Sequence, residues 1–90
     1  MPSRLKEARR KAVGTNETLR ALETGSAVVV FVAADAEQRV TRPVLELAAR
    51  QQLELIRVEA MSALGRLCGI DVGTACAALL KEPAGRVMNV

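Results

Sequence analysis

The longest stretch without a polar side chain covers residues 27–34 and predicts the central strand of a sheet. It reads Ala-Val-Val-Val-Phe-Val-Ala-Ala. A short β-branched run without alternation is typical of a strand covered on both faces. Two further apolar runs, at 55–58 and 76–80, predict two more strands, and Arg57 indicates that the first of these lies at an edge or has a half-exposed face. Residues 12–13 allow no more than a stub of strand.

Between these runs, apolar residues at helical spacing predict helices. They are expected at residues 3–11, after a Ser3 cap, at about 15–24, from Thr41-Arg42-Pro43 to about residue 52, and from a Ser62 cap to residue 69. Proline in the first turn of a helix is tolerated, because its missing N–H has no partner there. Helices that alternate with buried strands predict a three-layer α/β/α sandwich with a small four-stranded mixed sheet. We expect one domain over residues 1–83, followed by a loose tail at 84–90.

The segment from Gly14 to Gly25 predicts a helix with one apolar and one polar face. Thr15 or Asn16 can cap its start, because a short side-chain oxygen accepts from the free N–H groups of the first turn. Gly25 can end it, because a residue without Cβ adopts a left-handed conformation at little cost. At about 100° per residue, the apolar side holds Leu19, Ala21 and Leu22, and the polar side holds Asn16, Glu17, Arg20, Glu23 and Thr24. An amide, a carboxylate and a guanidinium within one turn can read the edges of bases, so this helix start is a candidate RNA contact.

The composition limits how the chain could bind RNA. Of the 90 residues, 50% are hydrophobic, which predicts a folded domain, yet Phe31 is the single aromatic residue. Stacking of bases on aromatic side chains is therefore excluded as the main mode of binding. The net charge of +3 is mildly basic, and cationic residues crowd the first eleven positions at Arg4, Lys6, Arg9, Arg10 and Lys11. That cluster fits a solvated face as well as a surface that contacts phosphates.

Several functional classes are disfavoured. The chain has no histidine, and its two cysteines, Cys68 and Cys76, lack C-x-x-C spacing, so neither a metal site nor another cofactor is expected. No Ser or Cys nucleophile has a base beside it and no Walker-type glycine loop is present, so we expect no enzyme. Asp35 and Glu37 are more typical of a solvated loop than of a catalytic pair. No leader or membrane-length apolar run is seen, which predicts a cytoplasmic monomer with reduced thiols and no membrane or small-molecule partner.

Four segments follow one another at intervals that resemble one protein family. They are Gly14-Thr15-Asn16-Glu17-Thr18-Leu19-Arg20, the valine-rich run, Leu64-Gly65-Arg66-Leu67-Cys68-Gly69 and Ile70-Asp71-Val72-Gly73. Over about residues 4–81 the chain resembles the kink-turn-binding ribosomal protein family of the archaeal large-subunit "seven-Ae" type. Archaeal members typically carry proline at the position of Gly73. The glycine makes this chain resemble the bacterial branch of the family.

The resemblance implies a specific RNA target. A kink-turn is a helix–bulge–helix bent sharply at a three-nucleotide bulge and continued by tandem sheared G·A pairs. The resemblance implies that the helix start enters the widened groove at those pairs and that the loop of residues 70–74 covers the flipped-out nucleotide. Arg66 could hold a phosphate. The implied RNA-binding residues are Gly14, Thr15, Asn16, Glu17, Arg20, Arg66, Ile70, Asp71, Val72, Gly73 and Thr74.

Two positions depart from the family pattern, and each implied role has a structural alternative. Arg20 stands where lysine is usual, and Asp71 replaces the usual glutamate. Asn16 and Glu17 also suit ordinary capping and the helix dipole, and Arg20 suits a surface salt bridge with Glu17 or Glu23. Ile70 and Val72 could instead close the edge of the sandwich. The alternative function is a protein-interaction or ribosomal scaffold module of the same fold. The RNA itself could be ribosomal or a riboswitch-like regulatory RNA.

Overall fold

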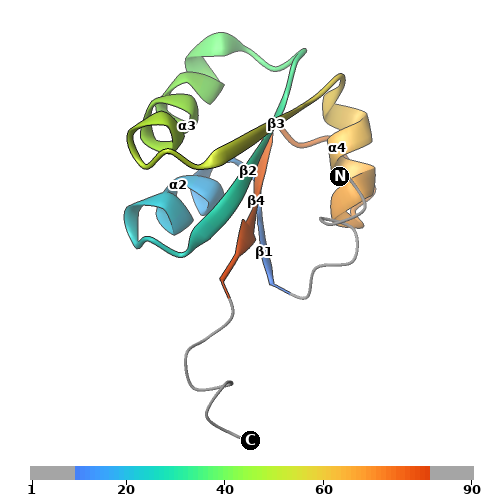
Figure 1. Cartoon of the computed structure of the whole chain (residues 1–90). Helices are drawn as coiled ribbons and strands as arrows, with labels where there is room; N and C mark the ends of the chain where they lie inside the picture. Colours follow the sequence, from blue (N-terminus) through green and yellow to red (C-terminus); the bar gives the residue numbers. More distant parts are fainter. Residues whose placement is uncertain (1–9, 82–90) are drawn as a thin grey trace, which may run out of the picture.

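The computed structural model describes residues 10–81, in which strands and helices alternate along the chain (Figure 1). The elements are β1 (Lys11–Val13), α2 (Thr15–Glu23), β2 (Ala27–Ala33), α3 (Gln38–Arg50), β3 (Glu54–Val58), α4 (Met61–Cys68) and β4 (Cys76–Leu80). The expected N-terminal helix and the expected tail lie outside the described residues. The helix prediction is wrong at its last two residues, because Arg10 lies in a bend and Lys11 pairs with Leu79 in the sheet.

The strands form one mixed sheet in the order β1-β4-β2-β3. β2 is parallel to β3, whereas β4 is antiparallel to both of its neighbours, β1 and β2. β1, β2 and β3 therefore run in the same direction, and each is followed by a helix. As a consequence, the N-termini of α2, α3 and α4 all lie at the same end of the sheet. β3, the strand with Arg57, lies at an edge of the sheet, which confirms the first of the two alternatives predicted for it.

The helices cover both faces of the sheet: α2 and α3 pack on one face and α4 on the other (Figure 1). β2 supplies both cores, because successive side chains of a strand point to opposite faces. Val30 and Val32 belong to the core under α2 and α3, whereas Phe31 belongs to the core under α4. All three side chains are essentially buried. The predicted three-layer α/β/α sandwich is confirmed.

The starts of two helices differ from the predictions. α3 begins at Gln38 rather than Thr41, so residues 38–40 belong to the helix and Pro43 lies in its second turn. This earlier turn forms because the Thr41 N–H reaches the Glu37 carbonyl at 3.2 Å. α4 begins at Met61, and its N-cap position is Ala60, so the predicted Ser62 cap is also wrong.

Candidate nucleic-acid interface

Gly14 links β1 to α2 and determines where the helix starts. Its φ of +99° lies in a region that L side chains rarely adopt, and an added Cβ would meet no atom within 4 Å. Glycine is therefore required by the backbone conformation and not by lack of space. The Gly14 N–H donates to the Cys76 carbonyl at 2.9 Å, and the Gly14 carbonyl accepts from the Thr18 N–H at 2.9 Å.

The predicted side-chain cap of α2 is wrong. Gly14 occupies the N-cap position, and no side chain caps the helix. Thr15 is instead the first helical residue, and a hydrogen bond joins its side chain to the Cys76 thiol. Asn16 and Glu17 are exposed at the second and third helical positions. The first turn therefore presents its N–H groups together with an amide and a carboxylate.

The two sides of α2 largely follow the prediction. Ala21 and Leu22 are buried, Leu19 is partly buried, and Arg20 is exposed. Within residues 10–81 Arg20 forms no salt bridge with a glutamate of its helix, so the structural alternative for Arg20 is not observed. The core side also contains Thr18, which is fully buried and whose hydroxyl has no partner among the described residues.

A shallow groove borders the polar side of α2. Its volume is about 210 Å³, and Glu17 and Arg20 line it together with Lys11 of β1. Of the N-terminal basic cluster, the structure describes Arg10 and Lys11, and of these two Lys11 lines the groove. The sequence signal for Lys11 was only its position in a run of cations.

The loop of residues 70–74 returns along α4. Gly69 ends α4 in the left-handed conformation with φ +84°. The Thr74 N–H then donates to the carbonyl of Met61, the first residue of α4, at 3.1 Å. The buried Thr74 hydroxyl donates to the Cys76 carbonyl at 3.1 Å. This carbonyl also accepts from Gly14, so one oxygen joins the end of the loop to the start of α2.

The side chains of the loop differ in exposure. Val72 is 69% exposed, and Asp71 and Gly73 are also exposed. Ile70 is half-buried and packs against the core under α4, as the structural alternative predicts. Val72 does not, so the structural alternative is wrong for that residue. Arg66 is exposed in the last turn of α4. The structure thus brings the helix start and the loop to one region, with Val72 as the loop's outward apolar side chain.

Asp35 has a role that the sequence analysis missed. Its Oδ1 accepts from the Met61 N–H at 2.8 Å, so it caps α4 from a loop far away in the sequence. The Ala34 N–H donates to the Val58 carbonyl at 2.7 Å and holds the same loop against β3. A carboxylate at a strand end was visible in the sequence, but its partner could not be identified without the sheet register.

The two cysteines lie in the two hydrophobic cores, Cys76 under α2 and α3 and Cys68 under α4. Both thiols are free and buried. Burial raises the pKa of both thiols, and the side-chain hydrogen bond of Thr15 opposes part of this effect at Cys76. The described residues contain no cluster of three or more acidic or cysteine side chains that could hold a metal ion. Over the same residues, no helix is long and apolar enough to cross a membrane.

Comparison with known proteins identifies relatives over most of the chain. An RNA-binding protein of Halalkalibacterium halodurans is 46% identical over 69 residues, which cover 77% of this chain and 84% of the relative. The large ribosomal subunit protein eL8 of Halobacterium salinarum is 43% identical over 68 residues, or 74% of this chain and 57% of that protein. A solved structure, the Giardia lamblia 15.5kD RNA binding protein, matches with a TM-score of 0.74 and 26% identity over 96% of this chain and 73% of its own.

The family model described as the ribosomal protein L7Ae/L30e/S12e/Gadd45 family matches residues 2–88. These matches confirm the resemblance seen in the sequence, including its bacterial relatives. They also agree with the expectation of a non-catalytic protein, since the relatives carry RNA-binding and ribosomal names. This chain belongs to the ribosomal protein L7Ae/L30e/S12e/Gadd45 family.

Proposed function

We propose that this chain is a structure-selective RNA-binding protein that recognises kink-turns. The start of α2 would contact the tandem sheared G·A pairs, and the loop of residues 70–74 would cover the bulged nucleotide. The observation that carries the proposal is the Cys76 carbonyl, which accepts from both Gly14 and Thr74 and so ties the two elements together. The protein would act as a cytoplasmic monomer on a ribosomal or regulatory RNA.

The chemistry of the helix start suits guanine edges. The Glu17 carboxylate can accept from guanine N–H groups, Arg20 can donate to guanine O6 or N7, and the Asn16 amide can do either. All three side chains are exposed on the first two turns of α2. Neither Asn16 nor Glu17 caps the helix, because Gly14 occupies the N-cap position, so both side chains are available to an RNA.

The electrostatics of the surrounding end of the sheet favour a polyanion. The N-termini of α2, α3 and α4 lie at this end, as the strand directions require. Each helix N-terminus carries a partial positive charge. The Asp35 carboxylate offsets this charge at α4, so the starts of α2 and α3 supply the positive potential that phosphates would meet. This contribution does not depend on the sequence of the RNA. Specificity would come from the α2 side chains and from the loop.

The loop offers the apolar contact that the missing aromatic side chains cannot provide. Val72 is 69% exposed, and its neighbours Asp71 and Gly73 leave it unobstructed at the surface. An unstacked base can bury part of its face against such a side chain. We therefore assign Val72 to the bulged nucleotide.

The test is a binding titration with two RNAs that differ only at the G·A pairs. One is a short kink-turn with fluorophores on both arms, and the other carries Watson–Crick pairs in place of the sheared pairs. We expect tight binding and a rise in energy transfer for the first RNA only, because a ligand that selects the bent state shifts the bending equilibrium. Equal, salt-sensitive binding to both would contradict kink-turn recognition. Binding to neither would favour the protein-interaction module.

A further inference from the structure

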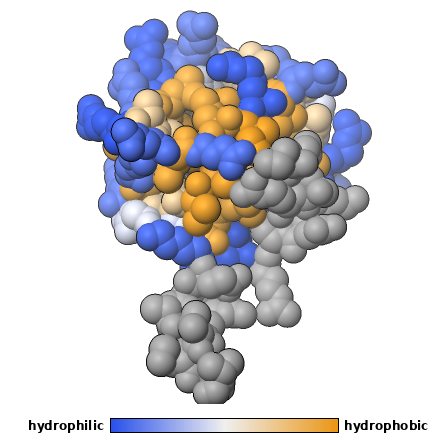
Figure 2. Space-filling view, viewed as in Figure 1, coloured by the Kyte–Doolittle hydropathy of each residue, from blue (hydrophilic) through white to orange (hydrophobic). Residues whose placement is uncertain are grey.

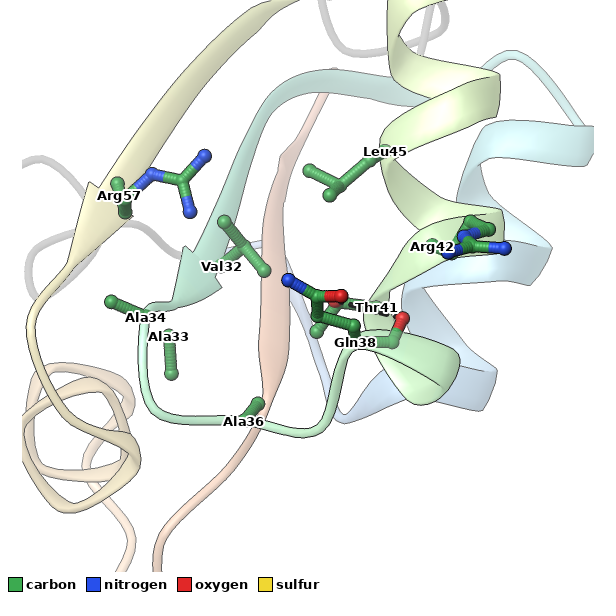
Figure 3. A pocket seen from close by; sticks show the side chains of 9 residues that line it. All are labelled: Val32, Ala33, Ala34, Ala36, Gln38, Thr41, Arg42, Leu45 and Arg57. Atoms are coloured by element: carbon green, nitrogen blue, oxygen red, sulfur yellow. Dashed lines mark hydrogen bonds between the residues drawn. The ribbon is translucent and has the colours of Figure 1, made fainter.

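A second pocket opens at the same end of the sheet, between α3 and the edge strand β3 (Figure 3). Its volume is about 330 Å³. It lies at the carboxyl ends of the parallel strands β2 and β3, where open α/β sheets commonly bind ligands. Its lining residues are Val32, Ala33, Ala34, Ala36, Gln38, Thr41, Arg42, Leu45 and Arg57. None of the residues proposed for the kink-turn belongs to this set.

The pocket exists because α3 does not extend over β3. Arg57 and Val32 are register partners on neighbouring strands, so both point to the face that α2 and α3 cover. Leu55, on the same side of β3, is nevertheless 40% exposed. Figure 2 shows the consequence, since apolar side chains gather at the centre of this view within a hydrophilic rim. The alanines after β2 leave the remaining space unfilled.

Three kinds of group face this space. Leu45 and Arg57 point toward one another from opposite sides, with Val32 between them, and Gln38 reaches in from the first turn of α3 (Figure 3). The Arg42 guanidinium, by contrast, points away on the other side of α3. The pocket therefore combines an aliphatic wall, a planar cation and an amide that can donate and accept.

The charge of the pocket is uncompensated. No carboxylate lines it, and within residues 10–81 Arg57 forms no salt bridge. Two acidic residues flank the lining alanines in the sequence, and both have other partners: Asp35 accepts from Met61, and Glu37 pairs with Arg39 at 3.6 Å. Glu46, beside Leu45, and Glu59, two residues after Arg57, are not among the lining residues. A ligand that fits this lining has an anionic group and an apolar, planar body with polar edges. A nucleotide has these features.

We propose that this pocket binds one unpaired nucleotide, with the base between Leu45 and the Arg57 guanidinium and its polar edge at Gln38. A guanidinium plane can stack on a base where aromatic side chains are absent. The nucleotide would come from an unpaired strand of the bound RNA or from a free mononucleotide. The proposal rests on RNA binding by this chain but not on its preference for kink-turns.

The first arm of the test uses RNA. A blunt-ended kink-turn RNA is compared with the same RNA carrying unpaired adenosines at its 5′ or 3′ end. We expect an extended RNA to bind on the order of five times more tightly, the size of one exposed stacking or cation–π contact. Arg57→Ala should remove this gain and leave affinity for the blunt RNA unchanged. The control is Arg50→Ala, an exposed arginine in the last turn of α3, which should keep the gain.

The second arm uses AMP without RNA, followed by the NMR signal of the Gln38 side-chain amide, with inorganic phosphate as the control. A shift with AMP and none with phosphate identifies the free nucleotide as an occupant, whereas a gain seen only with extended RNA identifies the RNA strand. The proposal is overturned if neither arm responds, or if both arginine variants lose the gain equally. Failure of the blunt RNA to bind would contradict the kink-turn proposal instead. Thermal unfolding of both variants verifies that they fold.

Discussion

Gly65 of α4 lies directly against the backbone of Val72. A Cβ built on Gly65 would overlap the Val72 carbonyl oxygen and lie 3.2 Å from the Cα of Gly73. The backbone at Gly65 is ordinary helix, so the glycine has no conformational reason to be there. Contact with the loop is the reason, and it determines how closely the loop can lie against α4.

Replacement of Gly65 by alanine should therefore move the loop. Alanine favours a helix interior over glycine by about 1 kcal/mol, so a loss of stability would have to come from the loop contact. We expect the free energy of unfolding to fall by about 1–3 kcal/mol, as for other overpacked sites. Denaturant unfolding measures it, with Ser62→Ala, an exposed change in the same helix, as the control.

The same variant tests the proposed role of the loop. Gly65→Ala should weaken binding to a kink-turn RNA with an intact bulge by several-fold, since Val72 would no longer meet the bulged base. It should have less effect on an RNA in which that nucleotide is abasic. Equal losses on the two RNAs would contradict a contact between the loop and the bulge.

Glu17→Ala should selectively weaken recognition of the G·A pairs. We expect a loss of about 1–3 kcal/mol in binding free energy, typical of a side chain that reads a base edge. The preference for sheared pairs over Watson–Crick pairs should fall with it. Glu23→Ala is the matched control, because Glu23 is exposed at the last residue of the same helix. Anisotropy titrations on both RNAs measure the effect, and an unchanged preference would remove Glu17 from the site.

Asp35→Ala should destabilise the fold. The carboxylate caps α4 through the Met61 N–H, and loss of a cap typically costs about 1 kcal/mol. Glu37→Ala, in the same loop, should have almost no effect, because its ion pair with Arg39 is exposed. Urea unfolding of the two variants would distinguish a cap from a merely solvated carboxylate.

The pH dependence of stability should report the buried thiols. Burial raises the pKa of the Cys76 thiol above its ordinary value of 9.0, so the folded state retains the proton to higher pH than the unfolded state. This contribution to stability is complete below pH 9 and is lost as the pH rises through the folded pKa. Cys76→Ala should reduce the loss of stability measured between neutral pH and about pH 10. An unchanged slope would show that other groups cause it.

Local sequence patterns determined most of the elements. The apolar run that forms β2 and the run that forms β4 were identified to within one residue, because a strand buried on both faces needs a continuous apolar stretch. The exposed start of α2 was identified as well, because one side of the helix must face the core. Both patterns involve residues that are close together along the chain, so they can be recognised in a single sequence.

Helix starts were predicted less well, because the group that caps a helix can come from a distant part of the chain. Thr15, Thr41 and Ser62 were each expected at or near a cap, yet none fills the N-cap position. α4 is capped by Asp35, which is 26 residues away in the sequence. A capping donor or acceptor can come from any segment that packs nearby, and local pattern contains no information about which one does.

The sequence by itself thus determined the type of fold and the family, and it supplied the candidate residues that we propose for RNA contact. The tertiary structure decided which of them meet. The sheet order places β4 beside both β1 and β2, so the Cys76 carbonyl joins Gly14 to Thr74, and α3 leaves Arg57 uncovered on the edge strand. The physical reason is that strand order and helix placement depend on packing between distant segments, whereas periodicity records only which side of each element is buried.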